Sequence, residues 1–126
     1  MKQYLVLALA LSLIILLNIW QTNFLNKTSK YILTDINDIE NSVKRQDYNA
    51  VLKGINELEN TWYIVESGWD IFGEHNDIEQ INERIESMKV YATYQDIEEL
   101  ANESKLLENI IKHVIESEKL NIGNVL

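Results

Sequence analysis

The fold class follows from residues 51–72, which read VLKGINELENTWYIVESGWDIF. Apolar side chains recur in this stretch at alternating steps of four and three residues, at Val51, Ile55, Leu58, Trp62, Val65, Trp69 and Phe72. Such spacing places all of them along one face of an α-helix. The stretch therefore predicts an amphipathic helix whose apolar face must be buried against other helices.

Similar apolar stripes lie on both sides of this stretch. The chain contains no Pro and only four Gly, and no segment sustains an alternation of period two, so strands are not expected. We predict an all-α chain with an antiparallel bundle of three to four amphipathic helices joined by short loops. The flanking stripes comprise Ile32, Ile36, Ile39 and Val43, then Ile78, Ile81, Ile85, Met88 and Ala92, and finally Ile97, Leu100, Ser104, Leu107, Ile111 and Val114.

The breaks between the stripes carry residues that are typical of helix ends. We expect Gly73 to close the second helix, and we expect N-terminal caps at Asp47, at Asn76 with Glu79, and at Asp96 with Glu99. A weak repeat accompanies these caps, because Gln46-Asp47 recurs as Gln95-Asp96 and Leu58-Glu59-Asn60 as Leu107-Glu108-Asn109, both 49 positions later. The repeat fits two duplicated helical hairpins, or simply similar caps on similar amphipathic helices.

The N-terminus is apolar on every side. No charged residue occurs from Tyr4 to Leu17, and Ile19 and Trp20 extend the run. It amounts to about 17 residues, or roughly 25 Å of helix, against a hydrocarbon core about 30 Å thick. We therefore predict a transmembrane anchor over residues 1–24, an uncleaved signal-anchor in contact with membrane lipid through residues 4–20. An acidic helical-bundle domain follows over residues 25–126, and its first helix either continues from the span or breaks at Asn26 to Ser29.

The alternative for this segment is a signal peptide that is cleaved, which would leave a secreted protein. Cleavage requires small residues one and three positions before the cut, and residues 18–24 offer no such pair. Lys2 precedes the span, while Lys27 and Lys30 follow it, so the positive charges are nearly balanced. Because almost nothing precedes the span, we expect the N-terminus inside, and a single-pass protein of the cell membrane with an extracytoplasmic C-terminal domain.

Charge and composition exclude several classes of function. The chain has 11 Lys and Arg against 20 Asp and Glu, a net charge of −9, and no Cys. Disulfides, thiolate metal sites and iron–sulfur clusters are therefore excluded, and nucleic-acid binding is disfavoured because no basic stripe exists. No nucleophile-elbow motif or phosphate loop occurs either. We expect neither an enzyme nor a cofactor.

Four residues are the candidates for a metal site, namely His75, Asp77, His113 and Glu116. The two histidines fall at similar heights in an antiparallel bundle and would suit zinc or another divalent ion if the third and fourth helices are neighbours. The simpler interpretation makes His75 a loop residue that helps to cap the third helix. His113 would then favour the negative end of the fourth helix dipole. We prefer the simpler interpretation and assign no metal.

The aromatic stripe of Trp62, Trp69 and Phe72 is the candidate partner-binding site. Large aromatic side chains at helical spacing are usual in a core, but the same stripe would also form a groove for a helix of another protein. We expect a non-enzymatic interaction or accessory module whose partner is another membrane protein or a second copy of the chain. The alternative is a bundle that senses a ligand or a divalent metal through His75 and His113.

The chain resembles a known family through a set of short motifs. They are Leu25-Asn26-Lys27-Thr28 after the span, Asp47-Tyr48-Asn49-Ala50, Leu58, Trp62 and Trp69, His75-Asn76-Asp77-Ile78, Ile85, Tyr91 and His113. This set resembles the bacterial family called domain of unknown function 4363, described from clostridia and their relatives, over nearly the whole chain. Members often have Trp at the position of Tyr48 and an Asp-His pair at Glu74-His75, so the aromatic and the carboxylate are kept. The resemblance implies a small membrane-anchored helical protein that faces out of a Gram-positive cell, and it lends no activity.

Overall fold

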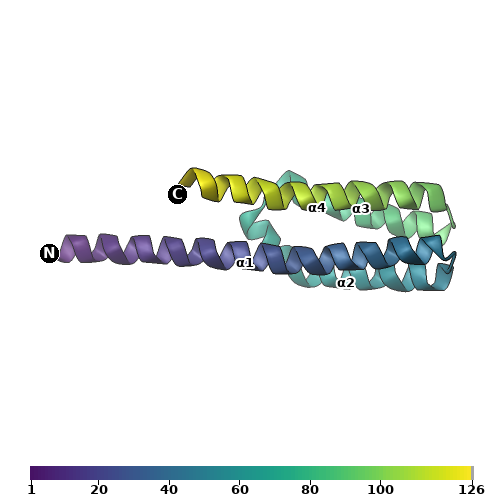
Figure 1. Ribbon diagram of the computed structural model, residues 1–126, viewed down its shortest axis with the longest axis horizontal. Helices are drawn as coiled ribbons and strands as arrows, with labels where there is room; N and C mark the ends of the chain where they lie inside the picture. Colours follow the sequence, from purple (N-terminus) through teal and green to yellow (C-terminus); the bar gives the residue numbers. More distant parts are fainter. Residues whose placement is uncertain (126) are drawn as a thin grey trace.

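The computed structural model of the protein describes the backbone of residues 1–125 and the side chains of residues 1–120. Leu126, the last residue of the predicted bundle domain, lies outside the described residues. Within the described part every regular element is a helix, as predicted, and consecutive helices run antiparallel (Figure 1). The four helices are α1 (Lys2–Lys44), α2 (Tyr48–Phe72), α3 (His75–Thr93) and α4 (Ile97–Val125).

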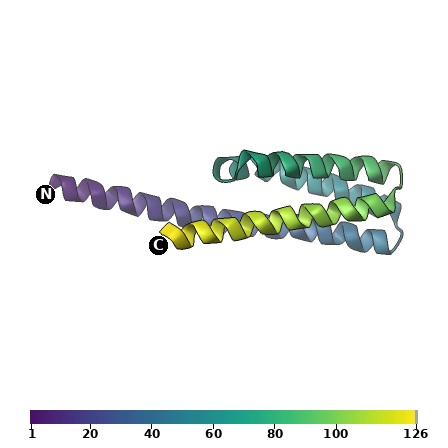
Figure 2. The same cartoon turned by 90° about the horizontal axis from the view of Figure 1, so that it is seen from above.

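The helices form a four-membered bundle with up-down-up-down connectivity. Helix α1 contacts α2 and α4, and α3 contacts the same two helices, while among the described residues neither diagonal pair is in contact. The N-terminal part of α1 projects beyond this bundle as a free helix (Figures 1 and 2). The bundle is therefore confined to the later part of α1 and the three helices that follow.

Helix α1 runs for 43 residues without interruption. The open question about Asn26 to Ser29 is thus resolved in favour of a continuous helix. No Pro occurs in the chain, and its first glycine is Gly54. The polar side chains in this stretch bond to their own helix, since the Thr28 hydroxyl donates to the Phe24 carbonyl at 2.7 Å and the Ser29 hydroxyl donates to the Asn26 carbonyl at 2.9 Å. Serine and threonine side chains often favour turns because they offer the backbone hydrogen bonds that compete with those of the helix. Here both hydroxyls bond to carbonyls of their own helix, and the helix continues through them.

The core consists of the predicted stripes. Of the seven apolar residues that define the stripe over 51–72, six are buried and Phe72 is half-buried. The apolar stripes of the other helices face this stripe, so apolar surface is buried along the full length of the bundle. Each Å² of apolar surface that is removed from water stabilises the fold by about 25 cal/mol. The largest side chains with at most 2% exposure include Trp69, Ile36, Ile39, Leu58, Ile81, Met88, Leu100, Leu107 and Ile111.

Two of the predicted caps are confirmed and one is wrong. The Asp47 carboxylate accepts a bond from the Ala50 amide at 3.1 Å, and the Asp96 carboxylate accepts one from the Glu99 amide at 3.3 Å. Helix α3, however, begins at His75 with Glu74 as its N-cap, so Asn76 lies inside the first turn. The Glu74 carbonyl already accepts two amides of that turn, so the helix starts before Asn76 without a capping side chain. Gly73 follows the end of α2 as predicted.

The weak sequence repeat extends to the loops and the core. The loops after α1 and α3 each place a glutamine at positive φ, 58° for Gln46 and 57° for Gln95, a conformation that is uncommon for residues other than glycine. Buried residues also recur at the same offset along both hairpins, for example Ile36 with Ile85. The hairpin α1–α2 therefore corresponds to α3–α4, and the seam between α1 and α4 corresponds to the seam between α3 and α2.

Candidate functional site

No residue of the apolar N-terminal segment, residues 4–20, is buried in the bundle. Its most apolar 18-residue window within α1 has a mean hydropathy of 2.1, and none of that window is buried. Helix α1 is therefore long and apolar enough to cross a membrane. An exposed apolar surface of this size is unfavourable in water and marks contact with lipid or with another protein.

An aromatic junction, defined by Trp20, Phe24 and Phe72, lies where α1 enters the bundle. The rings of Trp20 and Phe24 stack at 5.6 Å, and Phe72 meets Trp20 edge-on at 5.4 Å. A Cβ atom added at Gly68 would collide with the Phe24 ring. The glycine therefore makes room for this ring against α2, and Leu25 next to it is already buried.

Trp62 and Trp69 lie in the core, the location that is usual for such a stripe, and neither ring is exposed on the surface of this chain. They are 4% and 0% exposed and meet edge-to-face at 5.5 Å. Trp62 donates its indole N–H to Asn82 at 2.7 Å, and Trp69 donates to Thr28 at 2.8 Å. The physical reason is that α2 turns this face toward the other helices. Phe72, the third predicted contact, is half-buried in the aromatic junction.

A different set of apolar side chains is exposed, and we call Tyr31, Ile64 and Ile71 the α1–α2 strip. They are 54%, 75% and 71% exposed. Tyr31 and Ile64 line a groove of about 440 Å³ between the two helices, and Phe24 lines it as well. Sequence reasoning missed the strip because single exposed apolar residues are common on protein surfaces. Only the pairing of α1 with α2 brings Tyr31 and Ile64 to one groove, and Ile71 lies seven residues from Ile64 on the same face of α2.

The same groove contains the half-buried carboxylate of Asp35. The Thr61 hydroxyl of α2 donates to Asp35 of α1 at 2.7 Å. Burial raises the pKa of the Asp35 carboxyl, the Thr61 hydrogen bond opposes this change, and the charges of Glu57 and Asp38 add to the increase. Asp35 and Lys27 are the two charged residues that line the groove, and every other lining side chain is apolar or carries a hydroxyl group. The groove is therefore suited to apolar and hydrogen-bonding contacts.

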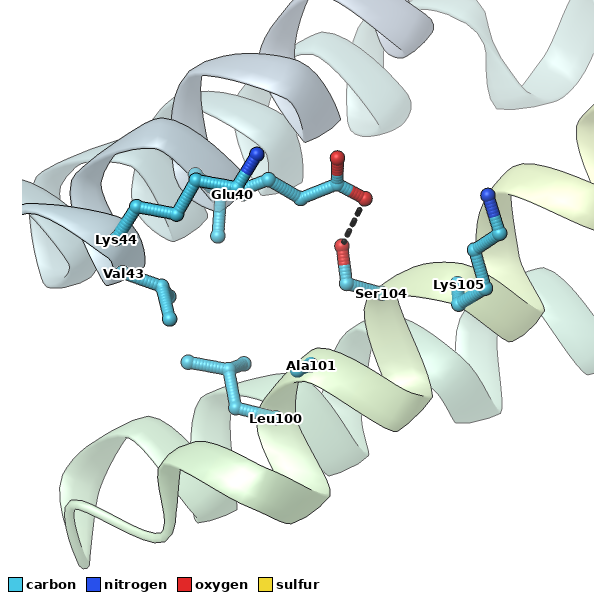
Figure 3. A pocket seen from close by; sticks show the side chains of 8 residues that line it. Glu40, Val43, Lys44, Leu100, Ala101, Ser104 and Lys105 are labelled. Atoms are coloured by element: carbon cyan, nitrogen blue, oxygen red, sulfur yellow. Dashed lines mark hydrogen bonds between the residues drawn. The ribbon is translucent and has the colours of Figure 1, made fainter.

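A second hollow, the α1–α4 pocket, lies at the end of the bundle that is remote from the aromatic junction. Its volume is about 240 Å³, and Figure 3 shows Val43 and Leu100 facing one another across it. The Ser104 hydroxyl donates to Glu40 at 3.4 Å on the rim. The pocket has the size and apolar character to hold a small apolar group. Its remaining lining residues are Ile39, Lys44, Ala101 and Lys105.

Small residues on α4 create this pocket. Ala101 and Ser104 line it, and the structural repeat pairs them with Leu52 and Ile55 on α2. At these two positions α2 thus carries larger aliphatic side chains than α4, whereas on the facing helices Ala92 of α3 stands at the repeat position of Val43 of α1. The α1–α4 pocket therefore lies where the side chains of the two corresponding halves of the bundle differ in size.

The metal candidates are only partly brought together. Asp77 and His113 line one open pocket of about 390 Å³ between α3 and α4, together with the cationic Arg84. His75 lies outside this lining and contacts Glu79 at 3.1 Å, and Glu116 is exposed on α4. Across the described residues no group of three or more His, Asp and Glu is arranged to hold a metal ion.

Arg84 has a structural partner instead. Its guanidinium lies 2.8 Å from the carboxylate of Glu103, which is largely buried between α3 and α4. An ion pair of this kind ties two helices together at a defined register, because each charge would be costly to bury alone. This pairing also places a positive charge in the pocket that His113 lines, which disfavours a cation there.

The architecture defines a class of protein, a four-helix bundle whose first helix extends into a free apolar segment long enough to span a membrane. Within this class, the chain belongs to the family described as "Domain of unknown function (DUF4363)", which matches residues 19–125. The matched region begins beside Trp20 and thus includes the aromatic junction and the described bundle. No curated protein and no solved structure matches the chain significantly.

Proposed function

We propose that this protein is a single-pass membrane protein whose extracytoplasmic bundle acts without catalysis, as an interaction module for another membrane protein or for a second copy of itself. One observation carries the proposal. Helix α1 holds an exposed apolar segment at one end and part of the bundle core at the other, with no break between them. The anchor and the bundle are thus joined through one continuous helix, which limits how the bundle can be oriented relative to the anchor.

Contacts at the junction favour an anchor that is retained. Trp20 contacts Phe72, and the Gln21 side-chain amide donates to Glu118 at 2.7 Å. Cleavage after Trp20 or after Gln21 would remove one or both contacts. Signal peptidases also require small residues one and three positions before the cut, and residues 18–24 lack such a pair. These contacts support a signal-anchor over a secreted protein.

The height of the α1–α2 strip supports a partner that is itself in the membrane. Eight residues separate Ile64 from Phe72 at the junction, which is about 12 Å along α2. Tyr31 lies 11 residues beyond Trp20, about 16 Å along α1. A protein that covers the strip must therefore lie within about 20 Å of the lipid surface, where the juxtamembrane part of a membrane protein is found.

In-cell photo-crosslinking tests the proposed surface. A photoreactive amino acid replaces Ile64 in the full-length protein, and the matched control replaces Asn109 on α4. Asn109 is exposed and lies nine residues from Glu118, just as Lys30 lies nine residues from Gln21, the partner of Glu118. Asn109 is therefore level with Lys30. Lys30 precedes Tyr31, which lines the same groove as Ile64, so positions 64 and 109 lie at similar heights above the membrane. We expect a defined adduct with a membrane protein or a second copy from position 64 and none from position 109. Equal adducts from both positions, or none from position 64, would contradict the proposal.

The orientation has its own test, because the chain lacks cysteine. A Tyr94→Cys variant places a single thiol in the exposed connection between α3 and α4. We expect a membrane-impermeant maleimide to label it in intact cells and the protein to stay with the membrane in alkaline carbonate. Labelling that occurs only after lysis would show that the bundle faces the cytoplasm. Release of the protein by carbonate would contradict the proposed membrane anchor.

A further inference from the structure

Helix α4 is longer than the bundle requires. It contains 29 residues against 19 in α3, its antiparallel neighbour. Figures 1 and 2 show its C-terminal end extending past the connection between α2 and α3, beside the part of α1 that has left the bundle. Neither the core stripes nor the proposed interaction surface uses this end.

One hydrogen bond sets the depth that α4 reaches. Gln21 of α1 donates to Glu118 of α4 at 2.7 Å, so the two residues are nearly level. Because the helices are antiparallel, the seven residues that follow Glu118, residues 119–125, run beside the seven residues that precede Gln21. This distance is about 10 Å of helix, and it coincides with residues 14–20 of the apolar segment.

The charge pattern of α4 changes at the same depth. From Ile97 to Lys119 the helix carries nine charged residues, whereas residues 120–126 read LNIGNVL and carry none. Leu120, the first residue of this uncharged end, is 70% exposed. Charged side chains are costly in hydrocarbon. A segment that lies level with residues 14–20 of the anchor would be in hydrocarbon, and the end of α4 has no charged side chain there. Burial already raises the pKa of the Glu118 carboxyl just before this point.

We propose that the C-terminal end of α4, residues 120–125, inserts into the outer leaflet beside the anchor and forms a second contact with lipid. The inference rests on the proposed membrane anchoring through residues 4–20. Two attachment points instead of one restrict the tilt of the bundle, because α1 and α4 lie side by side. The α1–α2 strip is thereby held at a constant height above the lipid.

Spin labelling of single cysteines in the full-length chain tests this inference. The protein is reconstituted into phosphatidylcholine vesicles with a nitroxide at one of four positions. Leu120→Cys and Val125→Cys report on the end of α4, Leu13→Cys reports on the anchor, and Tyr94→Cys reports on the remote loop. At positions 120 and 125 we expect faster relaxation by oxygen than by a water-soluble nickel complex, with the larger ratio at position 125. Position 94 gives the opposite preference.

The four labels separate the two proposals. Labels at 120 and 125 that behave like the label at 94, while the label at 13 prefers oxygen, overturn the lipid contact of α4 and leave the anchor intact. A label at 13 that prefers nickel overturns the anchor and the inference together. Labels at 120 and 125 that neither reagent reaches would mean that protein covers the end of α4, which also overturns the lipid contact.

Discussion

The indole nitrogen of Trp69 in α2 lies 2.8 Å from the hydroxyl oxygen of Thr28 in α1, and both side chains are buried. The same hydroxyl donates to the Phe24 carbonyl at 2.7 Å. One hydroxyl thus accepts a bond from the neighbouring helix and donates one within its own helix. This arrangement joins α1 to α2 about one turn from Phe24 and Phe72 of the aromatic junction, where α1 passes from the bundle into the apolar segment.

The Thr28→Val variant tests this bond, because valine keeps the shape of threonine and lacks the hydroxyl. The buried indole N–H then has no partner, and we expect the free energy of unfolding to fall by about 1–3 kcal/mol. Urea denaturation of the detergent-solubilised full-length protein measures the change. Thr28→Ser retains the hydroxyl and serves as the control. A Thr28→Val variant as stable as the wild type would show that the bond contributes nothing.

The close contact of Gly68 with Phe24 gives the second prediction. Replacing glycine by alanine within a helix normally stabilises it by about 1 kcal/mol. Here the added methyl would collide with the Phe24 ring, and we expect Gly68→Ala to destabilise the bundle by about 1–3 kcal/mol through overpacking. Thermal unfolding followed by circular dichroism measures this.

A second background makes the Gly68 prediction specific. In a Phe24→Ala chain the ring is absent, so Gly68→Ala is expected to become neutral or stabilising there. A loss of stability of the same size in both backgrounds would show that Phe24 is not the cause. This comparison is a double-mutant cycle on two residues in direct contact.

The spacing of apolar residues was sufficient to predict the helices and most of the core. Steps of four and three place Trp62 and Trp69 on one face, and that face is buried. Asp47 and Asp96 could be predicted as caps because an aspartate before a helix accepts backbone amides. These features depend on neighbours in the sequence. The same logic failed at Asn76, because backbone carbonyl bonds allowed α3 to start two residues earlier without a capping side chain.

The candidate surface was less accessible to sequence reasoning. Tyr31 and Ile64 form one strip only because α1 and α2 pair at a particular register, and nothing in either helix alone reveals that register. The sequence also left open whether Trp62 and Trp69 lie in the core or on the surface, because it does not say which apolar stripe is covered by other helices. The α1–α4 pocket likewise depends on which helix faces the small residues Ala101 and Ser104.

The half-buried carboxyl of Asp35 gives a prediction about pH. Burial raises its pKa in the folded protein, so between its ordinary value of about 3.9 and the raised value the folded state binds more protons than the unfolded state. Its contribution to stability therefore falls as the pH rises through this window. Asp35→Asn removes the ionisation and retains an acceptor for the Thr61 hydroxyl. We expect this variant to be more stable than the wild type near neutral pH.

The pH profile provides the check on Asp35. The stability difference between Asp35→Asn and the wild type, measured by urea denaturation, should shrink as the pH falls and vanish below the ordinary pKa of an aspartate. Asp70→Asn, at an exposed position of α2, controls for the loss of one negative charge. A difference that is constant across the whole pH range would contradict the prediction.

The α1–α4 pocket gives the final prediction, because the other half of the bundle shows how it can be filled. Leu52 is the counterpart of Ala101 in the structural repeat, and Ala101 lines a pocket of about 240 Å³. Ala101→Leu therefore places a side chain that this architecture accommodates elsewhere into empty apolar space. We expect a gain of about 0.5–2 kcal/mol in the free energy of unfolding, as cavity-filling substitutions typically provide. Leu52→Ala is the reciprocal variant and should destabilise the α2–α3 seam. If Ala101→Leu lowered the melting temperature, the leucine would be overpacked, and the two seams would not be equivalent in shape.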